Sequence, residues 1–301
     1  MRPILGLLLA TFVLAQAPPR ALLRVTTPEQ DPPLDRASFR ATINGRDAKV
    51  LRARGPGDDV VIILVLDLCG DPTLIDTARQ SFAEQLPKLP ANHWIAVMKA
   101  QDTLQALTDP SPDREKTLAA IREYGATGKA ALLTTIEEST RLAHRLLTKS
   151  NLRVALLYVT DSNVYNYRED FTNPVINSSD TRDLSRRFPD QLVRDQIQKA
   201  SDRLARFEVP FYVVHLNYFS DPINESYQRG LLQLATESGG SGAFCRSRGE
   251  VPSALEQILG EAVRHWSVTL ETERGKARAL AVDLFNGDRD VPNRARYVIG
   301  K

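Results

Sequence analysis

The feature that most constrains the fold is the stretch "VVIILVLD", Val60 to Asp67, in which an unbroken aliphatic run ends in an aspartate. A strand with one face in water alternates apolar and polar residues, whereas a continuous apolar run predicts a strand that is buried on both faces of a parallel sheet. A second run of this kind, "LRVALLYVTD", ends in Asp161. The two runs therefore predict a mostly parallel sheet covered by helices on both faces.

The segments between these runs predict the covering helices. Apolar residues recur at helical spacing from Leu74 to Leu86. The segment "SPDREKTLAAIREYG" predicts another helix, with Ser111 as its cap and Gly125 as its end. Because strand and helix patterns alternate along the chain, we predict the α/β class, with a doubly wound, Rossmann-like sheet.

Both ends of the chain predict small β additions to this domain. "SFRATINGRDAKVLRARG" alternates on either side of Asn44 and Gly45, which is typical of a hairpin, and the tail repeats the pattern around Asn286 and Gly287. The predicted division is a signal peptide at 1–17, a β segment at 18–57, the α/β domain at 58–264 and a β extension at 265–301.

The first residues of the chain predict export. Arg2 precedes a short apolar run from Ile4 to Leu14, and the small residue Ala15 follows, which is the layout of a secretory signal peptide. The run is too short to span a bilayer as a helix. We expect a periplasmic or extracellular protein with no stable membrane span after signal cleavage; an uncleaved N-terminal anchor is the alternative.

Composition restricts the partners and the disulfides. With 42% hydrophobic and 25% charged residues the chain is an ordinary globular one. Its net charge of +2 comes from interspersed signs, so we expect no nucleic-acid partner. Cys69 and Cys245 could pair in an oxidising compartment, but the predicted strand order keeps them apart, and we expect two free thiols.

Asp67 and Asp161 each follow a buried strand, and ligands of open parallel sheets gather at that edge. From about Phe39 to the C-terminus the chain resembles the von Willebrand factor A domains, and more closely the secreted bacterial VWFA-related proteins. The resemblance rests on "VVIILVLDLCGDP", "GKAALLTTI", "LRVALLYVTDS" and "LATESGGSGAFCRSRGEVPSALEQILGEAVRHWSVTLE". It implies the same α/β fold with a ligand-binding edge.

The metal site of that family uses an Asp-x-Ser-x-Ser turn, a later Thr and an Asp after the fourth strand. Asp67 and Asp161 match this pattern, whereas Cys69 and Asp71 stand where the serines would, and Ala130 stands where the threonine would. Magnesium prefers hard oxygen ligands, and a thiol is a poor donor. The resemblance thus implies a degenerate site with Asp67, Asp71 and Asp161 as remaining possible ligands. We expect no cofactor, with Ca²⁺ or Mg²⁺ as the alternative.

Two metal-free arrangements are open at this edge. The carboxylates of Asp67 and Asp161 could accept hydrogen bonds from backbone N–H groups of the following turns. Alternatively, the ammonium group of Lys129 could lie between the two carboxylates in place of a cation.

Enzymatic chemistry finds little support. The sequence contains no glycine-rich phosphate loop. Its four histidines are not spaced like metal ligands; they are His93, His144, His215 and His265. Carboxylates near Cys69 are expected to raise its pKa, which argues against a thiolate nucleophile. We therefore predict that the chain is not an enzyme.

A long insertion, Ser162 to Asp190, follows Asp161 at the same edge. Its aromatic residues and arginine have the composition of an interface; they are Tyr165, Tyr167, Arg168 and Phe171. We predict an exported module that binds a protein or surface polymer. The alternative is a structural or assembly module whose A domain has lost ligand binding.

Overall fold

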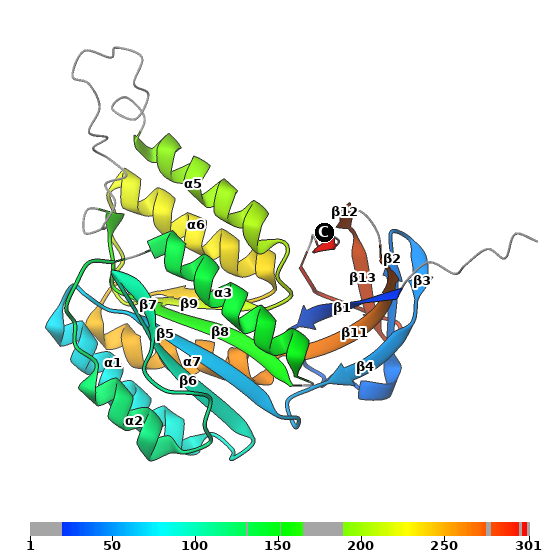
Figure 1. The fold of residues 1–301 in the computed structure, drawn as a ribbon, viewed down its shortest axis with the longest axis horizontal. Coiled ribbons are helices and arrows are strands. Elements are labelled where there is room, and N and C mark those ends of the chain that lie inside the picture. Colours follow the sequence, from blue (N-terminus) through cyan, green and yellow to red (C-terminus); the bar gives the residue numbers. More distant parts are fainter. Residues whose placement is uncertain are drawn as a thin grey trace, which may run out of the picture.

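The computed structural model describes residues 20–130, 132–150, 152–164, 189–274, 278–294 and 297–299. The predicted signal peptide, residues 1–17, lies outside them. An α/β part with a central sheet between helices lies beside a smaller part built of strands (Figure 1).

The central sheet has six strands in the order β10-β9-β8-β5-β6-β7. The strands are β5 (Val60–Asp67), β6 (His93–Gln101), β7 (Thr103–Ala106), β8 (Arg153–Thr160), β9 (Phe211–His215) and β10 (Gly242–Phe244). The edge strand β7 runs antiparallel to β6, and the other pairings within this sheet are parallel. The predicted fold class, a doubly wound and mostly parallel sheet, is confirmed.

Helices cover both faces of the sheet, which is why every residue of β5 and β8 is buried. Helices α1, α2 and α7 pack on one face, and α3, α5 and α6 lie on the other (Figure 1). Their bounds are α1 (Pro72–Gln85), α2 (Arg114–Glu123), α3 (Leu132–Lys149), α5 (Pro189–Leu204), α6 (Pro222–Ser238) and α7 (Val251–Arg264). Short 3-10 turns are η1 (Arg36–Ser38), η2 (Leu86–Lys88) and η4 (Arg248–Glu250).

The start of α2 corrects one prediction. Ser111 is not the cap, because its backbone pairs with Ile95 of β6 before the helix begins. Asp113 caps instead: its Oδ1 accepts from the backbone N–H of Lys116 at 3.1 Å. A carboxylate at this position also interacts favourably with the helix dipole.

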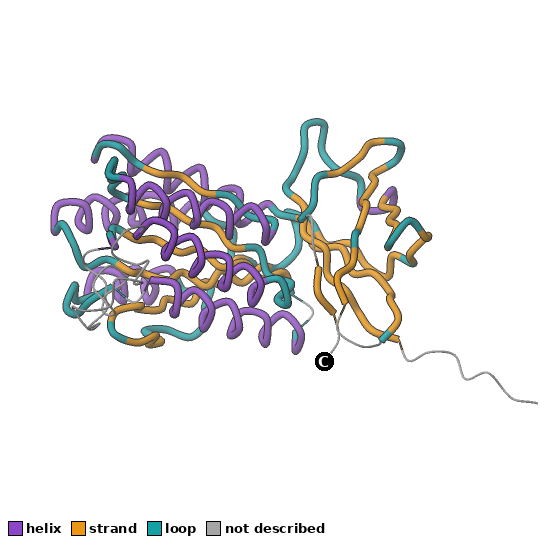
Figure 2. Tube along the Cα trace, turned by 90° about the horizontal axis from the view of Figure 1, so that it is seen from above, coloured by secondary structure: helices purple, strands orange, loops and turns teal. Residues whose placement is uncertain are grey.

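The smaller part is built from both ends of the chain. Its strands are β1 (Arg20–Thr27), β2 (Phe39–Ile43), β3 (Arg46–Ala48), β4 (Val50–Arg54), β11 (Trp266–Glu273), β12 (Arg278–Leu280), β13 (Val282–Asn286), β14 (Arg289–Val291) and β15 (Tyr297–Ile299). They form the sheets β1-β11-β4, β14-β13-β2-β3 and β12-β15. Strands from the two ends pair in both larger sheets and bury one shared core, so the two predicted additions form a single β unit (Figure 1). Figure 2 shows this unit of strands and loops beside the α/β part.

Both predicted hairpin turns are confirmed. Asn44 and Gly45 join β2 to β3 with φ of 52° and 74°, and Gly287 turns β13 into β14 with φ of 62°. A positive φ is costly for most side chains but not for glycine, which explains the residues chosen at these turns.

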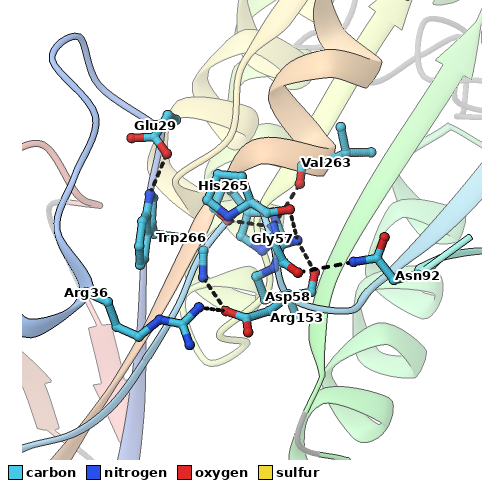
Figure 3. A network of polar contacts seen from close by, with 11 residues as sticks. Glu29, Arg36, Gly57, Asp58, Asn92, Arg153, Val263, His265 and Trp266 are labelled. Carbon is cyan, nitrogen blue, oxygen red and sulfur yellow. Dashed lines mark hydrogen bonds and ion pairs between the residues drawn. The ribbon is translucent and has the colours of Figure 1, made fainter. Parts of the chain in front are cut away.

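The two parts are joined through a buried arginine at the start of β8 (Figure 3). The Arg153 side chain is fully buried, and burial lowers its pKa to about 10. Its guanidinium donates to four backbone carbonyls, those of Pro56 (3.4 Å), Asp58 (2.5 Å), Val263 (2.8 Å) and His265 (2.8 Å). These carbonyls belong to the two chain crossings between the parts, β4 to β5 and α7 to β11. One side chain therefore fixes both crossings.

Tight packing accompanies this joint. A Cβ on Gly55 would lie 2.5 Å from the Trp266 ring, so the chain needs glycine there. The Trp266 indole donates to Glu29 at 2.9 Å, and the Asp58 carboxylate accepts from Arg36 at 2.6 Å (Figure 3).

Candidate functional site

The candidate site lies where β5 and β8 end side by side, because Asp67 pairs in register with Thr160. Asp67 is fully buried, and its Oδ2 accepts hydrogen bonds from the hydroxyls of Tyr158 (3.0 Å), Thr160 (3.1 Å) and Ser162 (3.2 Å). These three residues follow at every second position, so an extended chain projects them to one side. Oδ1 has no hydrogen-bond partner within the described residues.

The charge state of Asp67 follows from this burial. Desolvation raises its pKa to about 7, and the negative charge of Asp161 adds to the rise, while the three hydroxyl donors oppose it. Near neutral pH the carboxyl group is therefore held on the borderline between its neutral and charged forms.

Asp161 is clamped by the turn after β5. Its Oδ1 accepts from the backbone N–H of Cys69 at 2.9 Å, and its Oδ2 accepts from Gly70 at 2.9 Å and from Asp71 at 3.0 Å. A Cβ on Gly70 would lie 2.8 Å from Oδ2, so the clamp requires glycine. Burial raises the pKa of Asp161, and the three N–H donors act against that rise. The carboxylate thus ties the β8 loop directly to the β5 turn.

Cys69 and Asp71 both contact residues close to them in the site. The Cys69 sulfur lies 3.5 Å from the Ser162 hydroxyl, and burial, with the nearby Asp67 charge, raises the thiol pKa to about 12. Asp71 caps α1, with its Oδ1 accepting from the N–H and the hydroxyl of Thr73, both at 2.8 Å. These donors lower the pKa of Asp71. Cys69 is therefore a neutral thiol, as expected, and the Asp71 carboxylate is engaged in capping α1.

Lys129 and Ala130 approach the site from the α2–α3 connection. Ala130 is fully buried, and Lys129 is exposed. The backbone of Lys129 is bonded to Asp102 in both directions, at 3.0 and 3.3 Å. Within the described residues Lys129 forms no ion pair with Asp67 or Asp161, so the geometry does not place its ammonium between them.

The donor set does not fit the metal ion that the family resemblance implies. Magnesium and calcium need six or more hard oxygen ligands. Here the Asp161 oxygens accept backbone hydrogen bonds, Asp71 caps a helix, Cys69 is a neutral thiol and Ala130 offers no donor. Across the part of the chain that the structure describes, no group of three or more His, Cys, Asp or Glu side chains is arranged to hold a metal.

Several residues that form hydrogen bonds at the site were not predicted from the sequence. Around Asp67 they are Tyr158, Thr160 and Ser162, and at the turn after β5 they are Gln101 and Tyr124. Gln101 donates to the Leu68 carbonyl at 2.5 Å, and the Leu68 N–H donates to the Tyr124 hydroxyl at 3.0 Å. The signal for the first three was present, since hydroxyl residues recur with period two in "YVTDS".

The structure also bears on the predictions for the cysteines, the histidines and the insertion. Cys69 and Cys245 are free, with β9 and β8 between their strands, as predicted. Burial lowers the pKa of each histidine, and the four do not gather; they are His93, His144, His215 and His265. The proposed interface residues lie outside the described residues; they are Tyr165, Tyr167, Arg168 and Phe171. Among the described helices, none has the length and apolarity to cross a bilayer.

No family model matches the sequence, and no curated protein matches it either. Solved structures of similar fold include a mutant PilB minor pilin from Streptococcus sanguinis, at 10% identity and TM-score 0.49, covering 68% of this chain and 62% of the pilin. They also include a von Willebrand factor type A structure from Catenulispora acidiphila (9%, TM-score 0.46, 97% and 75% covered) and the ArnB paralog VWA2 from Sulfolobus acidocaldarius (9%, TM-score 0.42, 94% and 76% covered). Von Willebrand factor A structures thus stand among the neighbours, as the sequence resemblance leads one to expect. Likeness at these identities concerns the fold alone.

Proposed function

We propose that this von Willebrand factor A-like chain is an exported, non-enzymatic module that binds a protein or surface polymer without a metal ion. The clamp of Asp161 on the backbone of residues 69–71 carries the proposal. It supports a metal-free edge because oxygens that would face an ion instead join the loops after β5 and β8. Loops fixed on a rigid scaffold are the usual place for recognition.

The chemistry of the site supports a binding role over catalysis. The raised pKa of Cys69 keeps its thiol neutral, and the nearest hydroxyl, that of Ser162, already donates to Asp67. A thiol nucleophile needs a lowered pKa, and the pKa of Cys69 is raised. Export is supported by the signal-like sequence of residues 1–17.

The surface proposed for recognition is the carboxyl edge of the central sheet. Its exposed residues near the clamp are Gly70, Asp71, Thr127, Gly128 and Lys129. Both charge signs are present and no large apolar side chain is among them, which favours a polar partner. Polar contacts of this kind do not require the edge to carry an ion.

Charge reversal at this edge tests the proposal. Lys129→Glu is expected to weaken capture of the partner from the exported protein fraction roughly tenfold, about 1.4 kcal/mol, because it reverses an exposed charge beside the clamp. The matched control is Lys88→Glu, an exposed lysine in η2 at the opposite end of the sheet, which is expected to capture normally. Capture is measured with the immobilised full chain in EDTA and in magnesium, and equal capture is expected in both.

Loss of capture in EDTA would contradict the metal-free mode of binding. Equal effects of Lys129→Glu and Lys88→Glu would contradict the placement of the surface. Absence of any capture would favour the alternative, a structural or assembly module.

A further inference from the structure

One face of the sheet β1-β11-β4 gathers arginines. On β1, Arg24 points away from the core that holds Leu23 and Val25, because successive side chains alternate. The register places Arg24 opposite Thr269, and Thr269 opposite Arg52. The next row places Ser267 opposite Arg54. Cationic side chains from both outer strands therefore flank the hydroxyls of the middle strand.

A β-bulge in β4 adds an apolar residue to this face. Thr269 pairs with Arg52 and Leu270 pairs with Val50, so Leu51 is the extra residue. A bulge re-aims side chains, and here Leu51 and Arg52 are both exposed although they are adjacent in sequence. A regular strand would send one of them to the opposite face. The bulge thus presents an apolar and a cationic side chain together.

These residues line a pocket of about 140 Å³, the arginine pocket. Its polar lining is Arg24, Arg52, Arg54, Ser150, Ser267 and Thr269, with no carboxylate among the lining residues. At its rim Leu22 and Leu51 are 49% and 41% exposed, more than a core-facing strand residue would be.

Of the three arginines that line the arginine pocket, Arg24 alone forms an ion pair within the described residues. Glu208 is paired with Arg24 at 3.2 Å, and Glu271, beyond Thr269 on β11, is paired with Arg20 at 2.9 Å. Within the described residues Arg52 forms no ion pair, and neither does Arg54. The cations of Arg52 and Arg54, which have no carboxylate partner among the described residues, attract an anion.

We propose that the arginine pocket binds the phosphate group of an anionic phospholipid at a membrane surface. The guanidinium fork matches phosphate oxygens in pairs, and hydroxyls add further donors. Exposed leucines beside the cations suit the boundary at which a headgroup phosphate meets acyl chains, whereas free phosphate would leave them in water. The proposal concerns the β unit and is independent of the sheet edge proposed for partner binding.

Vesicle sedimentation tests the proposal with the full chain. Binding is expected to vesicles of phosphatidylcholine with phosphatidylglycerol, and not to phosphatidylcholine alone, at about 0.15 M salt. The double variant Arg52→Gln/Arg54→Gln is expected to weaken binding at least tenfold, and Leu51→Ser is expected to weaken it several-fold. The matched control, Arg122→Gln/Arg264→Gln, removes the same charge from exposed positions on α2 and α7 and should bind normally. Melting temperatures establish that each variant is folded.

Three results would overturn the proposal. One is no binding to the anionic vesicles. Another is equal weakening by the two double variants, which would indicate a general charge effect. The third is binding of inorganic phosphate, detected by titration calorimetry, without binding to vesicles. Because no protein partner is used, the outcome is separate from that of the capture experiment.

Discussion

Replacing Arg153 with Met is expected to lower the free energy of unfolding by about 3 kcal/mol or more. The substitution leaves two buried carbonyls, those of Val263 and His265, and two partly buried ones without their donor. Each buried unsatisfied group costs about 1–3 kcal/mol, partly offset by the desolvation cost of the removed charge. Arg153→Lys is expected to recover only part of the loss, since a single ammonium offers a different donor geometry from a planar fork. Urea denaturation measures both variants.

The control for Arg153 is Arg122→Met, which removes an exposed arginine of α2. Surface substitutions of this kind change stability by about 0.5 kcal/mol or less. A loss at Arg153 as small as the loss at Arg122 would show that the two chain crossings hold without the guanidinium.

Asp67→Asn is expected to gain stability relative to the natural protein as pH rises from about 4 to about 7. The folded-state pKa is raised to about 7 from an ordinary 3.8. Between these values the folded protein holds a proton that the unfolded chain has released, so the stability of the natural protein falls as pH rises. The slope is about 1.4 kcal/mol per pH unit, a few kcal/mol in all, and asparagine does not titrate.

Urea denaturation of both proteins at about pH 5 and about pH 8 checks this slope. Asp71→Asn is the control: the pKa of Asp71 is lowered, so its contribution is lost only as pH falls below about 4. A stability difference between Asp67→Asn and the natural protein that does not change with pH would show that Asp67 is an ordinary charged carboxylate.

The protonation of Asp67 bears on the site as a whole. Asp67 and Asp161 are both buried at one edge, and their charges repel. The resemblance to von Willebrand factor A domains implies a metal cation beside two such carboxylates. Below about pH 7 the protonated form of Asp67 removes this repulsion without an ion, which is consistent with a metal-free edge.

The fold could largely be predicted from the sequence because its strongest signals are local. The unbroken run of β5 cannot be placed with a face in water, and Asn44-Gly45 fits one kind of hairpin turn. The pairing of β1 with β11 could not be predicted, because strands from opposite ends of the chain carry no local signal of their partner. Arg153 gave a weak signal as a lone cation opening an apolar strand, but its partners are backbone carbonyls that no pattern reveals.

The site, too, could be predicted from the sequence only in part. That Asp67 and Asp161 meet follows from parallel strands that end at one edge. What their oxygens accept could not be predicted, because the donors are backbone N–H groups at residues 69–71 and hydroxyls that depend on the detailed course of two loops. For the same reason the sequence could not predict whether Lys129 lies between the carboxylates; in the structure Lys129 is exposed and, among the described residues, forms no ion pair with Asp67 or Asp161.

The central claim is that the carboxyl edge is complete without a metal ion, and thermal melting of the natural protein tests it most directly. A site filled to about a hundred times its dissociation constant would add roughly 2.7 kcal/mol, a rise of about 5–10 °C for a domain of this size. We expect the same melting temperature in EDTA, in magnesium and in calcium, because the oxygens of Asp161 are already bonded to the 69–71 backbone. A saturable rise with either ion that Asp161→Asn abolishes would contradict the account.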